Sequence, residues 1–334
     1  MYYLYVLLTY KGLSMKAIVG LILSCSVVSV ASQAAEEISV TPYIVGGVSA
    51  NVANYPYMAS LMFEYKTQPG VVYPFCGGSV LDERHILTAA HCVYDTSPSQ
   101  VANMKVAIEV NDGQGMAAAQ KVAVKKIYYP DNYNNSTLIN DVAVLELSES
   151  LPNYTYKHAV KLGDTSDQDY RMPMTEFTAV GYGRFSTSND NNGENKSVEF
   201  RETQVTYVNP TDCNFWANYT TSNKQVCATG RSFDNSNLVT ATCQGDSGGP
   251  LIWNGSQIGI VSFGPLICGD GRLNSQSVFT DVSQYKDWIR KAQKGELSSV
   301  ITVTEDSYSE SSGGSIPLGM IFVLSIFGFY RKYH

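Results

Sequence analysis

Short stretches of strand-like composition recur along most of the chain, with Gly, Pro, Asn and Asp in the segments between them. They lie at residues 58–63, 77–81, 101–110, 122–128, 142–147, 177–181, 199–208 and 257–263. Helical patterns are confined to a short stretch after Asn209 and to Gln284–Gln293, where Tyr285, Trp288 and Ile289 share one face. Many short strands separated by turns are typical of antiparallel barrels, so we predict an all-β fold with a short C-terminal helix.

The size and charge of the chain narrow its function class. It has 334 residues, of which 44% are hydrophobic and 16% are charged. Single all-β domains often reach about 200–250 residues, so one large folded unit is expected. The net charge is −7 and the middle of the chain carries no basic run. A nucleic-acid partner is therefore not expected.

The first 34 residues have the pattern of a signal peptide. Met15-Lys16 precedes an apolar run, Ala17–Val30, and Ser32-Gln33-Ala34 places small residues at both recognition positions of signal peptidase. We expect cleavage after Ala34, whether translation starts at Met1 or at Met15. Ser24-Cys25 hints at a lipoprotein site instead, but Leu23 fits that pattern poorly.

Cysteine content points to an oxidising compartment. Seven cysteines occur, and removal of the leader with Cys25 leaves six, an even number that suits disulfides. The spacing alone leaves their pairing open. No paired Cys-X-X-Cys spacing favours a metal site, so neither metal nor cofactor is expected.

Three short motifs carry the chemistry. Residues 243–250 place Ser247 between glycines in a sequence suited to a tight turn that exposes the hydroxyl. A serine is a weak nucleophile without a base, and residues 88–92 and 140–145 supply His91 and Asp141. Each residue alone has an ordinary structural explanation. Together, in the order His, Asp, Ser, they indicate nucleophilic hydrolysis.

These motifs resemble the trypsin/chymotrypsin family of serine endopeptidases over Ile44–Gln293. The resemblance implies two six-stranded antiparallel barrels, with Ser247 as nucleophile, His91 as base and Asp141 as its orienting partner. It also implies an oxyanion hole formed by the N–H groups of Gly245 and Ser247. Ser262 matches the family position that supports the triad aspartate.

The resemblance further implies three disulfides and a zymogen. The expected pairs are Cys76–Cys92, Cys213–Cys227 and Cys243–Cys268. Residues 35–43 would form an activation propeptide, and the new ammonium of Ile44 would pair with Asp246 after one cut. Tyr43 precedes that cut, where a basic residue would suit a trypsin-like activator, so a different activating specificity is expected.

The substrate pocket is predicted by alignment to the same family. Ala241 falls at the pocket floor, where trypsin-like members carry an aspartate. Gly264 would leave the entrance of the pocket open, and Ser277 in its wall would narrow the pocket. We therefore expect cleavage after uncharged aromatic or larger aliphatic residues rather than after Arg or Lys.

The composition changes after Gln293. Residues 294–315 are rich in Ser, Glu and Gly and predict a flexible linker. Residues 316–334 combine an apolar run with Arg331-Lys332, which predicts a hydrophobic helix with a basic end. With Gly313-Gly314, this tail resembles the Gly-Gly sorting tails of Gram-negative exoproteins, which implies transient anchoring and removal by a membrane protease. A permanent anchor is the alternative.

The sequence thus predicts a secreted serine endopeptidase that leaves through the periplasm, held briefly at the membrane before its tail is removed. Its expected partners are protein or peptide substrates, signal peptidase and the tail-processing protease. The alternative is a catalytically inactive, protease-like binding or adhesion protein tethered to the membrane. Loss of a triad residue is the usual mark of such a protein, and none is lost here.

Overall fold

The computed structural model of the chain describes residues 45–164, 168–183, 198–213, 221–232, 237–271, 275–304 and 307. The predicted signal peptide, the Tyr43–Ile44 cut and the hydrophobic tail all lie outside these residues. Within the described part of the chain, no helix is long and apolar enough to cross a bilayer.

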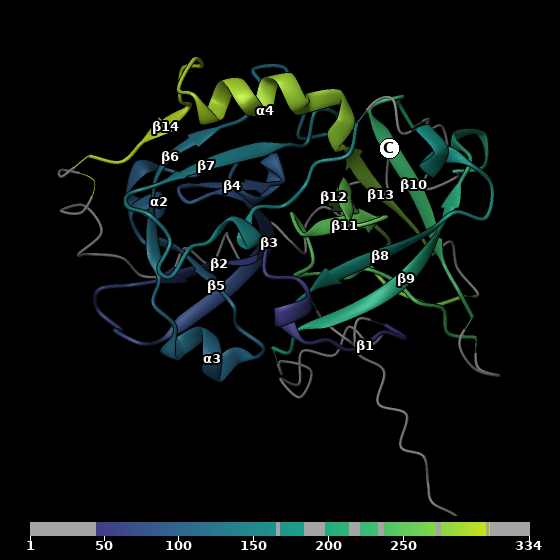
Figure 1. Cartoon of the computed structure of the whole chain (residues 1–334), viewed down its shortest axis with the longest axis horizontal. Coiled ribbons are helices and arrows are strands. Elements are labelled where there is room, and N and C mark those ends of the chain that lie inside the picture. The colour runs from purple at the N-terminus through teal and green to yellow at the C-terminus, as the bar shows by residue number, and fades with distance from the viewer. Residues whose placement is uncertain are drawn as a thin grey trace, which may run out of the picture. The chain divides into compact units, whose positions relative to one another are not determined.

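Two closed antiparallel barrels form the fold, as Figure 1 shows. In the first, the strands follow the order β6-β5-β2-β3-β4-β7, and pairing of β6 with β7 closes the barrel. The strands are β2 (Met58–Glu64), β3 (Val72–Asp82), β4 (His85–Thr88), β5 (Met104–Ile108), β6 (Val122–Tyr128) and β7 (Ala143–Leu147).

The second barrel repeats this plan in the order β9-β10-β13-β12-β11-β8, closed by pairing of β8 with β9. Its strands are β8 (Glu176–Gly181), β9 (Arg201–Val208), β10 (Gln225–Gly230), β11 (Pro250–Trp253), β12 (Ser256–Phe263) and β13 (Gln276–Asp281). The two-residue strand β1 (Val48–Ser49) adds to the edge of β9. The predicted fold of two six-stranded barrels is confirmed.

Alternation of side chains explains why these segments form barrel walls. Along β9, buried and half-buried residues alternate strictly from Arg201 to Val208, the period expected when one face of a strand looks into a core. A separate cluster joins the two barrels, with Met58 and Met62 of β2 packed in one group with Val180 of β8 and Phe200. The barrels therefore meet through apolar side chains.

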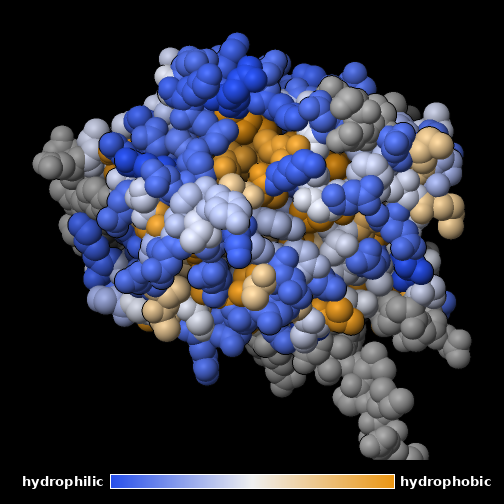
Figure 2. All heavy atoms as spheres, in the orientation of Figure 1, coloured by the Kyte–Doolittle hydropathy of each residue, from blue (hydrophilic) through white to orange (hydrophobic). Residues whose placement is uncertain are grey.

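Among the residues that the structure describes, helices are few and short, and the predicted C-terminal helix is present as α4 (Lys286–Gln293). Ile289 and Ala292 of α4 pack into the core of the first barrel, although α4 follows the second barrel in sequence (Figure 1). On the face in Figure 2, hydrophilic side chains cover the α4 region, and hydrophobic surface gathers just below it. Short 3₁₀ turns lie at Val52–Asn54, Ala90–Cys92, Tyr156–His158, Gln168–Arg171, Pro210–Asp212 and Val282–Tyr285.

Two further helices, α2 (Pro98–Ala102) and α3 (Gly113–Ala118), were not predicted from the helical pattern. Both are held by local capping. Ser97 and Gln100 form a capping box at α2, and the Asp112 carboxylate accepts the Gly115 N–H at 2.7 Å in α3. The strand predicted at 101–110 consequently begins only at Met104.

The linker prediction for residues 294–315 is wrong at its start. Val300 and Val303 donate backbone hydrogen bonds to Ile127 and Lys125 of β6, and residues Ile301–Thr302 form strand β14 there. Ile301 and Val303 are each only 9% exposed and join the core of the first barrel. Alternation of Ile301, Thr302 and Val303 supports a strand, although the Ser- and Glu-rich composition around it suggested a linker.

Candidate active site

His91 lies at the end of the first barrel. Strand β4 leads into the 3₁₀ turn Ala90–Cys92, which carries His91, and a disulfide from Cys92 to Cys76 fixes this turn to β3. The ring Nδ1 lies 2.8 Å from Asp141 Oδ2, and the His91 backbone N–H donates to Asp141 Oδ1 at 2.8 Å. Both oxygens of one carboxylate therefore orient this histidine.

Asp141 is fully buried, and the second barrel holds it. The hydroxyl of Ser262 on β12 donates to Asp141 Oδ2. The hydroxyl of Thr280 on β13 donates to the Asp141 backbone carbonyl at 2.7 Å. Sequence reasoning found Ser262 but missed Thr280, whose bond goes to a backbone atom and leaves no motif.

The contact with Asp141 sets the tautomer and basicity of His91. Because Asp141 accepts a hydrogen bond from the Nδ1–H of His91, the neutral ring keeps its lone pair on Nε2. Burial disfavours the imidazolium, but the charge and hydrogen bond of Asp141 outweigh it, so the pKa of His91 is raised. His91 is thus arranged to accept a proton at Nε2.

The Ser247 turn packs against the segment that leads to His91. The Gly77 N–H of β3 donates to the Ser247 carbonyl at 2.7 Å. Gly248 has a φ of +78°, and a Cβ there would lie 2.1 Å from the Thr88 hydroxyl oxygen. Only glycine fits this contact, which brings the nucleophile motif beside the histidine motif.

Two backbone N–H groups at this turn remain open. Among the described residues, neither the Gly245 N–H nor the Ser247 N–H has a hydrogen-bond acceptor. Gly245 has a φ of +103°, and a Cβ there would lie 2.9 Å from Gly183 Cα. The chain conformation therefore leaves a pair of donors beside Ser247, as a site for a developing oxyanion requires.

The segments that carry His91 and Ser247 pack together, but no hydrogen bond joins the two side chains. No hydrogen bond joins the His91 ring to the Ser247 hydroxyl within the described part of the chain, and Nε2 lies 3.8 Å from Cys92 Sγ. Nucleophile–base hydrogen bonds are often long before substrate binds. His91 also lies near both sulfurs of the Cys76–Cys92 pair, but sulfurs joined in a disulfide are not thiolate ligands for a metal.

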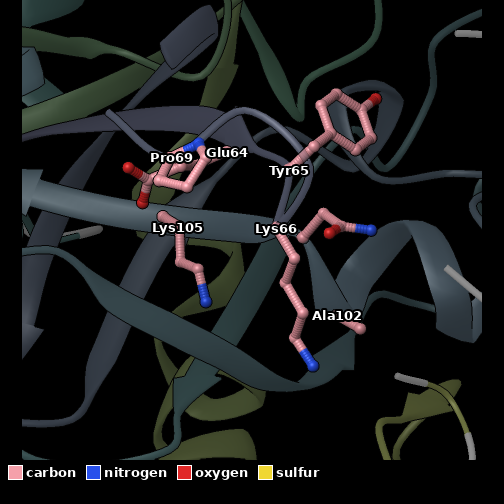
Figure 3. A pocket seen from close by; sticks show the side chains of 7 residues that line it. Glu64, Tyr65, Lys66, Pro69, Ala102 and Lys105 are labelled. Carbon is pink, nitrogen blue, oxygen red and sulfur yellow. The ribbon is translucent and has the colours of Figure 1, made fainter. Parts of the chain in front are cut away.

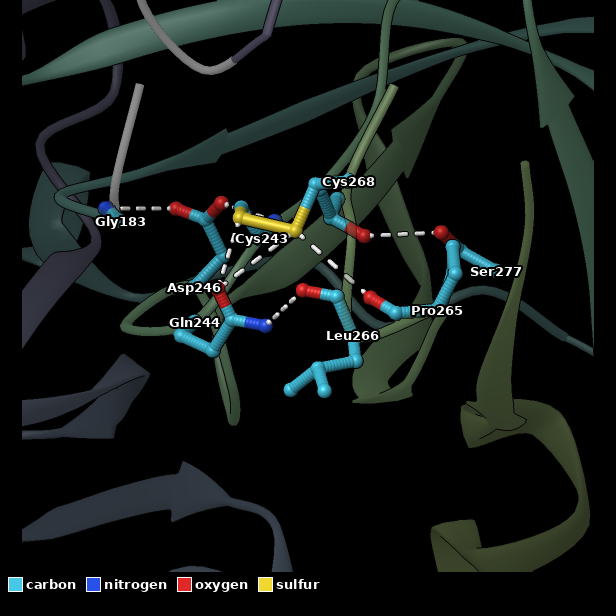
Figure 4. Close-up of a disulfide and its surroundings, with 9 residues drawn as sticks. Gly183, Cys243, Gln244, Asp246, Pro265, Leu266, Cys268 and Ser277 are labelled. Carbon is cyan, nitrogen blue, oxygen red and sulfur yellow. Dashed lines mark hydrogen bonds between the residues drawn. A yellow bond between two sulfur atoms is a disulfide. The ribbon is translucent and has the colours of Figure 1, made fainter. Parts of the chain in front are cut away.

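Asp246 is a buried carboxylate that backbone groups surround. It is 1% exposed, and the N–H groups of Gly183 and Cys243 donate to its two oxygens at 2.8 Å each, as Figure 4 shows for the Gly183 contact. Burial raises its pKa to about 7, while these two bonds act in the opposite direction. No cationic side chain pairs with Asp246 among the described residues. Ile44, its predicted partner, lies outside them.

The predicted pocket residues lie together in the second barrel. Ala241 and Ser277 are each 1% exposed, and Gly264 stands close enough that a Cβ there would lie 3.2 Å from Ser277 Oγ. The Thr242 hydroxyl donates to the Ser277 hydroxyl at 3.0 Å. The sequence analysis missed Thr242; its position next to Ala241 was the available signal. These four residues carry no charge.

The three predicted disulfides are confirmed. They join Cys76 to Cys92, Cys213 to Cys227 and Cys243 to Cys268. The third bridge closes the segment beside the pocket, where the Gln244 side-chain amide donates to the Leu266 carbonyl at 3.0 Å (Figure 4).

Two closed barrels, with an Asp-bound histidine beside a glycine-rich serine turn, are the arrangement of a chymotrypsin-like serine endopeptidase. Comparison with known proteins agrees. The family model described as Trypsin matches residues 44–289. Chymotrypsin-2 of Vespa crabro is 33% identical over 251 residues, which cover 75% of this chain and 100% of that protein. Trypsin of Sarcophaga bullata is 30% identical, over 75% of this chain and 89% of its own length.

Among solved structures, the secreted serine protease VesC from Vibrio cholerae matches with a TM-score of 0.57 and 29% identity. The match covers 74% of this chain and 48% of the VesC chain. The chain belongs to the trypsin family. It is a serine endopeptidase, a hydrolase of the trypsin/chymotrypsin type.

Proposed function

We propose that this endopeptidase cleaves protein substrates through an acyl-enzyme formed on Ser247. One observation carries the proposal. Both oxygens of Asp141 bind His91, and the adjoining serine turn has two N–H groups, those of Gly245 and Ser247, without a hydrogen-bond acceptor among the described residues. These are the parts needed for covalent acyl transfer.

Each residue then has a defined role. Ser247 Oγ attacks the scissile carbonyl while His91 Nε2 takes its proton. Asp141 holds the Nδ1–H tautomer and stabilises the imidazolium, and Ser262 and Thr280 hold Asp141. The N–H groups of Gly245 and Ser247 bind the oxyanion. His91 then gives its proton to the leaving amine, and water hydrolyses the acyl-enzyme by the same steps in reverse.

The state of Asp246 supports activation by one cut between Tyr43 and Ile44. A buried carboxylate with a pKa of about 7 and only backbone donors is poorly stabilised as an anion. The new ammonium of Ile44 would supply the missing positive charge. Val45, its neighbour, is already buried and accepts the Ala241 N–H at 3.0 Å. Activity should decline at alkaline pH as that ammonium loses its proton, since a free α-amino group has a pKa of about 8.

Substrate preference should follow the uncharged pocket. Ala241 offers no carboxylate for Arg or Lys, and Ser277, which accepts a hydrogen bond from Thr242, would narrow the pocket. Medium to large uncharged side chains such as Tyr, Phe, Leu and Met should precede the cut. Tyr43 satisfies the same rule, so the enzyme would be able to activate itself.

The segments at the two ends of the chain should direct secretion of the enzyme. A signal peptide over residues 1–34 and a tail removed near Gly313-Gly314 would give a secreted product, with the basic end of residues 316–334 holding a transient membrane stage. The secreted relative VesC supports this location. Strand β14 limits where the tail begins, because residues up to Thr304 belong to the folded protease.

Mass spectrometry of the mature protein, followed by a peptide-library digest, tests the whole proposal. We expect an N-terminus at Ile44, a C-terminus near Gly313 or Gly314, and cleavage after uncharged residues. Full activity of the intact precursor would contradict activation. A mature active enzyme that still ends at His334 would contradict tail removal. Absence of hydrolysis by correctly processed protein would instead favour an inactive binding protein.

A further inference from the structure

The residue before the catalytic aspartate has an unusual backbone conformation. Asn140, which precedes Asp141, is 7% exposed and has a φ of +60°, in the left-handed region. Asparagine tolerates this region better than most residues with a Cβ, but it still favours the right-handed one. Leu138, two residues earlier, also has a positive φ, of +53°. Contacts from the rest of the fold are therefore needed to hold this segment.

The conformation of Asn140 sets the direction of the Asp141 side chain. The Val142 N–H donates to the Asn140 carbonyl at 2.9 Å, which closes a three-residue turn with Asp141 at its centre. That carbonyl belongs to the peptide group that joins Asn140 to Asp141. A rotation of this peptide group would therefore also turn the carboxylate that binds His91.

Three hydrogen bonds hold the side-chain amide of Asn140. Its Nδ2 donates to the Asn132 carbonyl at 2.9 Å. Its Oδ1 accepts from the Tyr285 hydroxyl at 2.9 Å and from the Lys224 ammonium at 3.2 Å. Lys224 stands just before β10, and Tyr285 ends the 3₁₀ turn that follows β13. Two side chains that belong to the second half of the chain thus hold a segment of the first.

Lys224 is itself held at both its backbone and its side chain. Its carbonyl accepts the Asp281 N–H of β13 at 2.9 Å, one residue after Thr280. Its half-buried side chain places the ammonium 5.4 Å from the centre of the Tyr285 ring, which adds a cation–π contact. The strand that fixes Lys224 also carries the Thr280 hydroxyl, which binds the backbone of the catalytic aspartate.

We propose that Lys224 is a positioning residue, which acts through Asn140 on the orientation of Asp141. Its charged donor holds the Asn140 amide, the amide holds the left-handed backbone, and the turn at Asp141 directs the carboxylate toward His91. Among the described residues Lys224 has no hydrogen bond to the triad itself. Its effect therefore belongs to the chemical step and not to substrate binding. The inference rests on the proposed function of Ser247.

The test measures kcat and KM on a short peptide with full-length, activated enzyme, and an acylating titrant counts the active sites. Lys224→Met removes the ammonium and keeps a long side chain. We expect kcat per active site to fall about tenfold while KM stays within about twofold, because misplacement of a catalytic group slows the chemistry more than the binding. Lys224→Arg keeps a charged donor and should restore most of the lost kcat.

The resting enzyme gives a second measurement that needs no substrate. The proton on Nδ1 of His91 lies in the hydrogen bond to Asp141, so its NMR signal reports on that contact. The signal should move or broaden in Lys224→Met and return in Lys224→Arg. The melting temperature, measured on the same samples, shows whether each variant is folded.

A second background isolates the route through Asn140. Asn140→Gly removes the amide that Lys224 binds, and glycine adopts a positive φ at little cost. In that background, adding Lys224→Met should change kcat by less than about twofold, because the contact is already absent.

The matched control variant is Lys105→Met. Lys105 is also half-buried, but it lies on β5 at a pocket of the first barrel that includes Glu64 and Ala102 (Figure 3). No residue that lines this pocket belongs to the catalytic arrangement. Lys105→Met removes the same charge and should leave kcat unchanged.

Several results would overturn the proposal. One is an unchanged kcat per active site in Lys224→Met, even if the melting temperature falls, since Lys224 would then serve stability alone. Another is an equal loss in Lys105→Met, and a third is a full further loss in the Asn140→Gly background. If Lys224→Met does not fold, Lys224→Gln replaces it under the same criteria. Failure of the titrant to acylate the unaltered enzyme would instead refute the proposed function of Ser247.

Discussion

The charge of Asp246 should make the uncut precursor less stable as the pH rises from about 4 to about 7. In the folded chain its pKa is raised from 3.8 to about 7 by complete burial. At about 1.36 kcal/mol for each pKa unit, holding the carboxylate ionised in the fold costs about 4 kcal/mol. The fold favours the protonated carboxyl of Asp246. The contribution of this group to the stability of the folded precursor is therefore complete below the unfolded pKa near 3.8, and it is lost as pH rises through about 7.

Guanidinium unfolding of the precursor measures this effect. Ser247→Ala prevents self-cleavage, and the same protein with Asp246→Asn added serves as the reference. Between about pH 4 and pH 7 the free energy of unfolding should fall by up to about 4 kcal/mol more with aspartate than with asparagine. The asparagine amide also loses one of the two bonds from Gly183 and Cys243. That loss does not vary with pH, so the pH dependence isolates the charge.

Cleavage before Ile44 should then remove most of the difference, because an ammonium beside Asp246 stabilises the anion. A cut protein with the Ser247→Ala substitution should keep its stability from about pH 4 to pH 7, while the uncut protein loses it. If the precursors with and without Asp246→Asn have the same pH dependence, the carboxylate is not held at a raised pKa. If cutting changes nothing, Ile44 is not its partner.

Three further outcomes are expected. Ser247→Ala should lower kcat/KM on peptides by several orders of magnitude without changing the melting temperature, and more than a few per cent residual activity would refute the nucleophile. In the pH profile of kcat/KM, the midpoint on the acid side should lie above about pH 6.5, because Asp141 raises the pKa of His91 and the ring must be neutral to act as base. A midpoint below that value would contradict the His91–Asp141 geometry. Ile301→Ala should destabilise the first barrel by about 2 kcal/mol in denaturant unfolding, and an unchanged midpoint would show that β14 contributes nothing.

The site residues that act through their own side chains could be predicted from the sequence. His91, Asp141, Ser247 and Ser262 each stand in a local motif, and in the structure hydrogen bonds join His91 and Ser262 to Asp141. These residues are constrained by chemistry that few residue types perform, so their identity alone is informative.

The parts that depend on backbone geometry were not predictable. Asp246 is held by the N–H groups of Gly183 and Cys243, and any residue type supplies an N–H. Thr280 supports Asp141 through a carbonyl oxygen. Strand β14 was missed because a two-residue pairing with β6 depends on long-range contact rather than on local composition. Each of these contacts depends on the three-dimensional fold, so no local sequence motif predicts it.

Each barrel completes the site of the other, which explains why neither half is expected to be active alone. Asp141 comes from the first barrel, yet its supports, Ser262 and Thr280, stand on the second. Ser247 comes from the second barrel, yet its carbonyl is bound by Gly77 of the first. Bonds that cross the junction in both directions tie the histidine side to the serine side. Any change that separates the barrels must therefore disturb the orientation of His91 and the turn at Ser247 together, even when both barrels remain folded.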